Sequence, residues 1–204
     1  MALLAVGFAL SASAKIELPS ILCDNMVLQQ NAMVNLWGKA TPNAKVTITT
    51  SWAPLRRVQT TADAKGNWLV KVDTPAATFE PQTVKISDGE ALTLQNVLIG
   101  DVWVCSGQSN MEWRLKNCTT AQEDCAAAAN QPLLHLYNMR GITDTYDNEW
   151  SVEVCEKVNR LEYFHPAKWE LCSPEAAGDF SAIAYHFGKT LADSLGVHVG
   201  LVLN

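Results

Sequence analysis

The chain has 204 residues, 48% of them hydrophobic and 18% charged, and its formal net charge at pH 7 is −6. This composition is that of an ordinary globular protein. The negative charge and the lack of a lysine- or arginine-rich run disfavour nucleic acids and anionic membranes as partners. We therefore expect no nucleic-acid partner and no membrane span.

The N-terminus is apolar from Met1 to Ala14 and ends in Ala-Ser-Ala directly before Lys15. A small-x-small triplet after such a run is typical of a signal-peptidase site. The run is shorter than the roughly 20 apolar residues that cross a bilayer. We expect residues 1–14 to be a signal peptide that lacks the usual positive n-region, and the protein to be secreted or periplasmic. The alternative is a buried N-terminal strand or helix.

Residues 15–96 alternate apolar and polar positions in short segments that are separated by turn signals such as Thr41-Pro42-Asn43. This pattern predicts an antiparallel β-sandwich. The alternating positions are Val46 and Ile48; Trp68, Val70 and Val72; Val84 and Ile86; and Leu92 and Leu94. We expect Trp37 and Trp68 to fill the sandwich core. The alternative is that they form, with Trp52, a stacking surface for a glycan.

The pattern changes after Asn96. The run Val97 to Val104 is apolar on both faces, which favours a central strand of a parallel sheet. The expected elements that follow are a helix over Asn110–Cys118, a helix over Ala121–Ala129 capped by Thr119 or Thr120, a strand over Leu133–Met139 and an irregular stretch over Gly141–Glu175.

A long amphipathic helix comes next, with Asp179 or Ser181 as its cap, Gly196 at its end, and an apolar face made of Phe180, Ile183, Ala184, Phe187, Leu191 and Leu195. A strand over Val197–Leu203 completes the chain. Strands alternating with helices predict a parallel sheet with crossover helices over residues 97–204. Because three strands with few covering helices make a thin layer, we expect this part to be truncated at its C-terminus.

Ser109 is the candidate nucleophile. The apolar strand breaks at Ser106-Gly107 and brings Ser109 to a turn at the carboxyl edge of the sheet, where pockets of open α/β folds form. Gly107 lets a substrate approach the backbone, and Gln108 and Asn110 are suited to orient a sugar hydroxyl or an acyl carbonyl. The Ser109 N–H would donate to an oxyanion if a helix began there. The alternative is a serine that only caps a helix.

A catalytic serine needs a base, and the chain has four histidines. We expect His135 and His198 to pack within strands and His186 to have a structural or solvated role on its helix. His165 follows Glu162 by three residues, so that a carboxylate could orient it, but it falls in the irregular stretch. The sequence therefore offers a nucleophile without a convincing base.

The six cysteines allow fifteen complete disulfide pairings, and the sequence does not choose among them. No cysteine or histidine cluster has zinc spacing, so we expect no metal and no cofactor. Cys105 lies within the apolar strand before Ser109, and we expect it to be a small buried hydrophobic residue rather than a nucleophile.

The string from Gly100 to Glu112, GDVWVCSGQSNME, closely resembles the sialate O-acetylesterase family, carbohydrate esterases of the SGNH-hydrolase superfamily. Further similar blocks follow the family's order, so the resemblance runs from about residue 20 to the last residue. These blocks are Asp24–Gln30, Val34–Ala40, Gly66-Asn67-Trp68, Phe180–Phe187 and Val199–Asn204. The resemblance implies an N-terminal antiparallel β-sandwich followed by the start of a three-layer α/β/α SGNH-hydrolase domain with an incomplete parallel sheet.

The resemblance also implies an activity: removal of O-acetyl groups from sialic acid or a related acetylated sugar or glycan, through an acetyl-serine intermediate. Ser109 would be the nucleophile and, through its backbone N–H, an oxyanion donor. The family's glycine-rich loop, later asparagine and Asp-x-x-His-Pro block have no counterpart here, and Glu162-x-x-His165-Pro166 comes too early in the fold. We expect an incomplete and weakly active or inactive chain. The alternative is a carbohydrate-binding or structural protein with a non-catalytic α/β remnant; the oligomeric state stays open.

Overall fold

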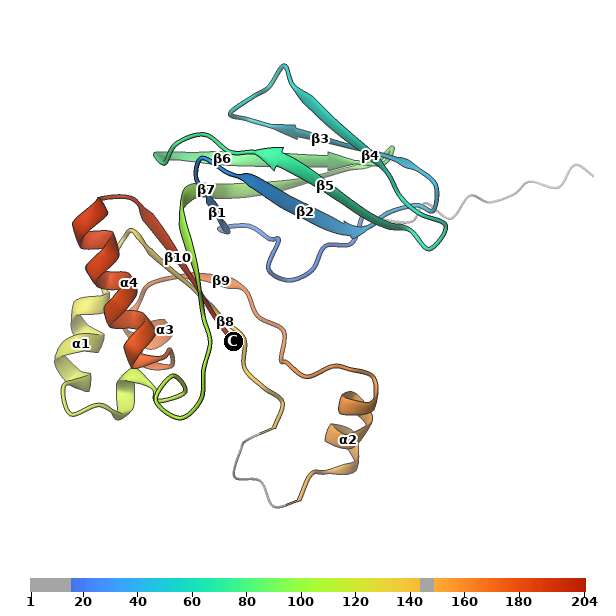
Figure 1. Ribbon diagram of the computed structural model, residues 1–204. Helices are drawn as coiled ribbons and strands as arrows, with labels where there is room; N and C mark the ends of the chain where they lie inside the picture. The colour runs from blue at the N-terminus through green and yellow to red at the C-terminus, as the bar shows by residue number, and fades with distance from the viewer. Residues whose placement is uncertain (1–15, 144–148) are drawn as a thin grey trace, which may run out of the picture.

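The computed structural model describes residues 16–143 and 149–204, so the expected signal peptide lies outside it. Within these residues an eight-stranded mixed sheet has the order β4-β3-β6-β7-β10-β8-β9, with β1 paired to β7 as well, and β2 and β5 form a separate two-stranded sheet (Figure 1). The strands are β1 (Val27–Gln29), β2 (Met33–Lys39), β3 (Lys45–Thr50), β4 (Arg57–Thr61), β5 (Asn67–Asp73), β6 (Thr78–Ser87), β7 (Ala91–Cys105), β8 (Leu134–Asn138), β9 (Trp169–Leu171) and β10 (His198–Leu203).

The helices found in the described residues all follow β7. They are the 3₁₀ helix η1 (Leu115–Asn117) and the α-helices α1 (Ala121–Ala128), α2 (Val152–Asn159), α3 (Pro174–Gly178) and α4 (Ala182–Leu195). α1, α3 and α4 lie together beside the parallel strands, whereas α2 lies apart from them (Figure 1). None of the helices in the described part of the chain is long and apolar enough to cross a membrane.

Strand β7 belongs to both halves of the mixed sheet. Its first half pairs antiparallel with β6, and its second half pairs in parallel with β10 and, over Leu98–Gly100, with β1. The strands expected on both sides of residue 96 are present, and the parallel pairing of β7, β10 and β8 fits an α/β hydrolase-like domain. A separate N-terminal sandwich is not set apart, because β7 runs through the expected boundary without a break.

Strand β7 bends at Asn96, shortly before its parallel pairing with β1 and β10 begins at Leu98 and Gly100. Asn96 has a left-handed backbone with φ 51°, and the pairing of β6 with β7 shifts register nearby. The segment ahead of β1 holds this point: Asp24 Oδ1 accepts a hydrogen bond from the Gln95 N–H at 2.7 Å, and Asn96 Nδ2 donates to Asn25 Oδ1 at 2.7 Å. The bend in β7 is therefore fixed by polar contacts from a distant part of the sequence.

The first hydrophobic core lies between the β2–β5 pair and the antiparallel part of the mixed sheet. It brings Leu36 and Trp68 together with Val46, Ile48 and other strand residues. Trp68 is 4% exposed, which confirms its expected place in the core and keeps it from stacking on a ligand. The same expectation was wrong for Trp37, which is 39% exposed. Successive side chains of a strand face opposite sides, and Leu36 takes the inward position on β2.

Helix α4 begins and ends where the sequence predicts. The Ser181 hydroxyl accepts a hydrogen bond from the Ala184 N–H, and Gly196 ends the helix in the left-handed conformation. The expected apolar face is confirmed for Phe180, Ala184 and Leu191, which are buried or packed on the core, but it was wrong for Ile183, Phe187 and Leu195, which are exposed. The buried residues are mostly small: Ala182, Ala184, Tyr185, Gly188 and Ala192. A Cβ on Gly188 would lie 2.5 Å from a Leu201 methyl group, so close approach to β10 selects this face.

Two other expectations about helices differ from the structure. Residues 110–118 were expected to be helical but form turns followed by η1, since Trp113 and Leu115 bond to the chain at residues 180–182 instead. The stretch Gly141–Glu175 was expected to be irregular but contains α2, β9 and the start of α3. Helix α2 spans only Val152–Asn159 and buries none of its residues, and so short a segment lies below the roughly 11 residues over which apolar periodicity reveals a helix.

The Asn96 bend yields a stability test. Both Asn96→Gly and Asn96→Val remove the bond to Asn25, but a β-branched side chain at positive φ is strained and glycine is not. We expect Asn96→Val to lower the free energy of unfolding by about 1–2 kcal/mol more than Asn96→Gly, measured by urea denaturation. Equal stability of the two variants would contradict the left-handed bend.

Candidate active site

Ser109 lies in a turn four residues beyond the end of β7. The turn spans Gln108 to Met111 and is closed by a hydrogen bond from the Met111 N–H to the Gln108 carbonyl at 2.9 Å. Ser109 has φ 44°, a left-handed conformation that costs a residue with a side chain about 1–2 kcal/mol. Such strained residues cluster at functional sites, where the surrounding structure holds them. The structure therefore presents Ser109, which is exposed, in a way that suits a nucleophile.

Gly107 allows this turn to close. A Cβ at this position would lie 3.1 Å from the Met111 Cβ, which is tighter than an ordinary contact. Met111 in turn links the turn to α4, because its sulfur accepts a hydrogen bond from the Ser181 hydroxyl at 3.3 Å. The residue that caps α4 thus also holds the loop that carries Ser109.

The segment after the turn is bonded to the α3–α4 junction through its backbone. The Leu115 N–H donates to the Phe180 carbonyl at 3.0 Å, and the Ala182 N–H donates to the Trp113 carbonyl at 2.9 Å. No α-helix begins directly after Ser109, so, contrary to the expectation from the sequence, its N–H is not one of the free N–H groups of a helix N-terminus. That N–H nevertheless makes no hydrogen bond to another described residue and can donate to an oxyanion.

Ser109 borders a cavity of about 500 Å³ at the carboxyl ends of the three parallel strands. Residues that follow β7 and β8 and the last residues of β10 meet there, as in open α/β sheets. The lining residues are Gly107, Ser109, Met111, Glu112, Trp113, Arg114, Asn117, Asn138, Met139, Arg140, Gly141, Thr143, Phe164, Asp179, Ser181, Leu203 and Asn204. Of the sequence-predicted residues, Gly107 and Ser109 line this cavity. Gln108 and Asn110 are exposed beside it.

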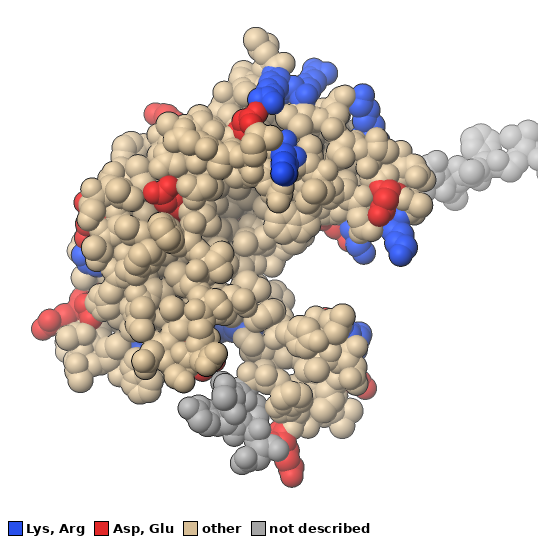
Figure 2. All heavy atoms as spheres, in the orientation of Figure 1, with Lys and Arg blue, Asp and Glu red and all other residues tan. Residues whose placement is uncertain are grey.

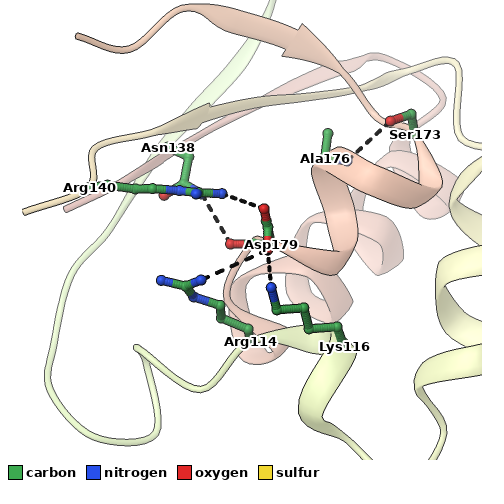
Figure 3. Close-up of polar contacts among 7 residues, drawn as sticks. All are labelled: Arg114, Lys116, Asn138, Arg140, Ser173, Ala176 and Asp179. Carbon is green, nitrogen blue, oxygen red and sulfur yellow. Dashed lines mark hydrogen bonds and ion pairs between the residues drawn. The ribbon is translucent and has the colours of Figure 1, made fainter. Parts of the chain in front are cut away.

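Asp179 is the centre of a charged cluster on the cavity wall (Figure 3). Its carboxylate lies 2.6 Å from Lys116 Nζ, 2.7 Å from Arg140 Nη2 and 3.8 Å from Arg114 Nη1. Asn138 Nδ2 donates to the Asp179 backbone carbonyl at 3.1 Å. The hydrogen bonds from Lys116 and Arg140 lower the pKa of the Asp179 carboxyl to about 2. Three cations therefore surround one carboxylate that stays ionised at physiological pH.

Sequence reasoning missed this cluster. Asp179 was considered only as a helix cap, and Arg114 was placed in a helix that does not form. Asn138 and Arg140 could have been predicted as site residues from the sequence. They lie at the end of the strand expected over 133–139, and the carboxyl ends of parallel strands share one edge of the sheet. Their convergence with Asp179 depends on the α3–α4 junction, which no local pattern reveals.

His165 lies at a second cavity, of about 760 Å³, next to the first. The two cavities share Arg114, Asn138, Arg140, Gly141, Thr143 and Asp179. The His165 N–H donates to the Arg140 carbonyl at 2.8 Å, which fixes its backbone, while the side chain is exposed. In the described part of the chain no hydrogen bond joins Ser109 to a histidine. The structure therefore brings His165 near the site without making it the partner of Ser109.

The other histidines are placed as expected. His135 Nε2 and His198 Nδ1 lie 3.0 Å apart in the interior, at the amino ends of β8 and β10 and so away from Ser109. Burial, and next the proximity of His198, lowers the pKa of His135 to about 4. His186 is exposed on α4, with its Nε2 3.5 Å from Asp124 Oδ2.

Cys105 is buried, as expected, and burial raises its thiol pKa. This disfavours the thiolate that a nucleophile needs. All six cysteines lie in the described residues and are free. Across residues 16–143 and 149–204, no group of three histidine, cysteine, aspartate or glutamate residues is placed to hold a metal ion.

Comparison with known proteins agrees with the motif around Ser109. The chain is 28% identical over 203 residues to the sialate O-acetylesterase of Mus musculus and 29% identical to that of Homo sapiens, in each case over 94% of this chain. A crystal structure of a carbohydrate acetylesterase from Xanthomonas citri superposes with a TM-score of 0.73 at 30% identity, over 93% of this chain. No family model matches the chain.

The chain is a relative of the sialate O-acetylesterases. It spans 36–37% of the length of the mouse and human proteins and 40% of the Xanthomonas citri structure. The resemblance stated from the motifs is thereby confirmed, and the relatives are named as esterases.

The charged residues on the face of the molecule shown in Figure 2 are scattered, and the lysines and arginines lie mostly over the antiparallel strands.

The Asp179 cluster predicts a pH-dependent stability. The folded-state pKa of about 2 lies below the ordinary value of 3.8, so the stabilisation is present above about pH 4 and is lost as the pH falls towards 2. We expect Asp179→Asn to lower the free energy of unfolding by roughly 1 kcal/mol at neutral pH, after allowance for solvent screening, and by progressively less below pH 4.

Urea denaturation at a series of pH values checks this. Asp193→Asn makes the same exchange in an exposed pair with Lys189 on α4 and is expected to change stability little at any pH. A loss for Asp179→Asn that is the same at pH 2 and pH 7 would contradict the assigned ionisation.

Proposed function

We propose that this chain carries the nucleophilic part of a serine-dependent carbohydrate O-acetylesterase, which removes acetyl groups from sialic acid or a related acetylated sugar. The observation that carries the proposal is Ser109, held at positive φ at the mouth of a cavity where the parallel strands end. The names of the relatives support an acetyl ester of a carbohydrate as the substrate.

In the proposed reaction the Ser109 hydroxyl attacks the acetyl carbonyl and gives up its proton. The backbone N–H of Ser109 donates to the oxyanion that forms, and donors of this kind act best where they are already fixed in place. The intermediate collapses by breaking the bond to the sugar oxygen, which takes a proton and leaves. Water then attacks the acetyl-serine and releases acetate, which regenerates the hydroxyl.

The proton acceptor is the missing part among the described residues, since no histidine there is bonded to Ser109. General-base catalysis contributes roughly 10²–10⁴-fold to such reactions. We therefore propose that this chain by itself turns over slowly, while the backbone N–H of Ser109, as an oxyanion donor, leaves the serine a residual reactivity.

Covalent labelling tests the nucleophile independently of turnover. We expect a fluorophosphonate probe to phosphonylate the chain at Ser109, as identified by mass spectrometry, and Ser109→Ala to abolish both this adduct and acetate release from an O-acetylated sialic acid. The matched control is Ser106→Ala, the same exchange at an exposed serine three residues earlier in the loop, which is expected to retain both.

Acetate release that survives Ser109→Ala would overturn the serine mechanism. Failure of the wild-type chain to show either the adduct or acetate release would overturn catalysis by this chain.

We also propose that the protein is exported, on the basis of the apolar run from Met1 to Ala14 and its Ala-Ser-Ala end. We expect the mature protein recovered from outside the cytoplasm to begin at Lys15, as read by N-terminal sequencing. Retention of residues 1–14 in that protein would contradict cleavage at this site.

A further inference from the structure

Arg114 is the loosest of the three cations around Asp179. Lys116 donates to one carboxylate oxygen at 2.6 Å and Arg140 donates to the other at 2.7 Å, so each oxygen has a close partner. Arg114 Nη1 stays at 3.8 Å, beyond hydrogen-bond distance, and its guanidinium makes no other polar contact with the described residues (Figure 3). Its N–H donors are therefore available to a ligand.

Arg114 also has the right position. It lines both the cavity of Ser109 and the neighbouring cavity, and its side chain is 41% exposed. Within the cluster, the single carboxylate of Asp179 is shared by three cations, and both of its oxygens already have closer partners than Arg114. Glu112 lines the cavity of Ser109, and Glu170 and Glu175 line the neighbouring one, but none of the three forms an ion pair with Arg114.

We propose that Arg114 is a specificity-determining residue, whose guanidinium binds the carboxylate of an acidic sugar while the acetyl group of that sugar reaches Ser109. This inference rests on the proposed function and names the substrate group, a carboxylate, that Arg114 would recognise. A guanidinium is planar and offers paired N–H donors that match a carboxylate, which a neutral acetylated sugar lacks.

The other members of the cluster have a positioning role. Asp179 fixes Lys116 and Arg140 and keeps part of their charge in balance, and it holds Arg114 near the cavity wall without using its donors. An incoming carboxylate then meets a positive charge whose position is already set, which reduces the ordering cost of binding.

Equilibrium binding tests the inference without requiring turnover. The probes are N-acetylneuraminic acid and its methyl ester, which differ at the carboxylate, with affinities for the full 204-residue chain measured by calorimetry or ligand-observed NMR. We expect the acid to bind about tenfold or more tightly than the ester, because hydrogen bonds to charged groups are stronger than neutral ones. We expect this preference to disappear in Arg114→Gln and to weaken as salt is added.

Two further variants control the result. Arg57→Gln makes the same exchange at an exposed arginine of β4, at the opposite edge of the mixed sheet, and is expected to keep the full preference for the acid. Arg114→Lys keeps the charge but loses the paired donors, and we expect it to keep only part of the preference. Unfolding curves show whether each variant is folded.

Equal binding of acid and ester by the wild-type chain, no binding of either, or an unchanged preference in folded Arg114→Gln would each overturn the inference. These outcomes are distinct from a failure of the proposed function. Phosphonylation of Ser109 and acetate release from a neutral aryl acetate ester test the nucleophile alone and do not depend on Arg114.

Discussion

The structure depends on strand β7, which pairs antiparallel with β6 at its start and in parallel with β10 at its end. The segment around β1 fixes this strand in place. Gln29 and Gln30 each donate from Nε2 to Asp101 Oδ1, at 3.0 and 3.1 Å, and Gln29 Oε1 accepts from the Val102 N–H at 2.8 Å. Together with the contacts of Asp24 and Asn25 at the bend, these bonds set the register of the strand that leads to Ser109. The block Asp24–Gln30, which the resemblance singled out, thus has a structural role far from the chemistry in sequence.

The loop after β7 combines strain with firm attachment. Ser109 has an unfavourable backbone conformation, and the bonds of Met111, Trp113 and Leu115 to the α3–α4 junction hold the loop that imposes it. The ion pairs of Asp179 add a second attachment through Arg140 and Lys116. A site held on rigid elements in this way needs little rearrangement when a substrate binds. The same junction therefore stabilises the fold and shapes the candidate active site.

Much of the architecture could be predicted because the relevant signals are local. The alternation at Val46 and Ile48 predicts a half-buried strand, the apolar run before Ser106 predicts the strand that leads to the site, and Gly196 marks the end of α4. Expectations failed where packing overrode a local pattern. The exposed face of α4 contains its large apolar residues because small residues allow the closest approach to β10. Residues 110–118 do not form the expected helix, because Trp113 and Leu115 make backbone hydrogen bonds to residues 180–182 instead.

The sequence by itself determined most of the longer strands, the parallel arrangement of the second half and the candidate nucleophile, because hydrophobic periodicity and a motif around Ser109 lie within short windows. Only the tertiary structure decided that β7 joins the two halves in one sheet and that Arg114, Asn138, Arg140 and Asp179 meet beside Ser109. These four residues come from three separate stretches of chain. Their meeting follows from the common edge of parallel strands and from the bonding of the loop to the α3–α4 junction, which are properties of the assembled sheet and not of any one segment.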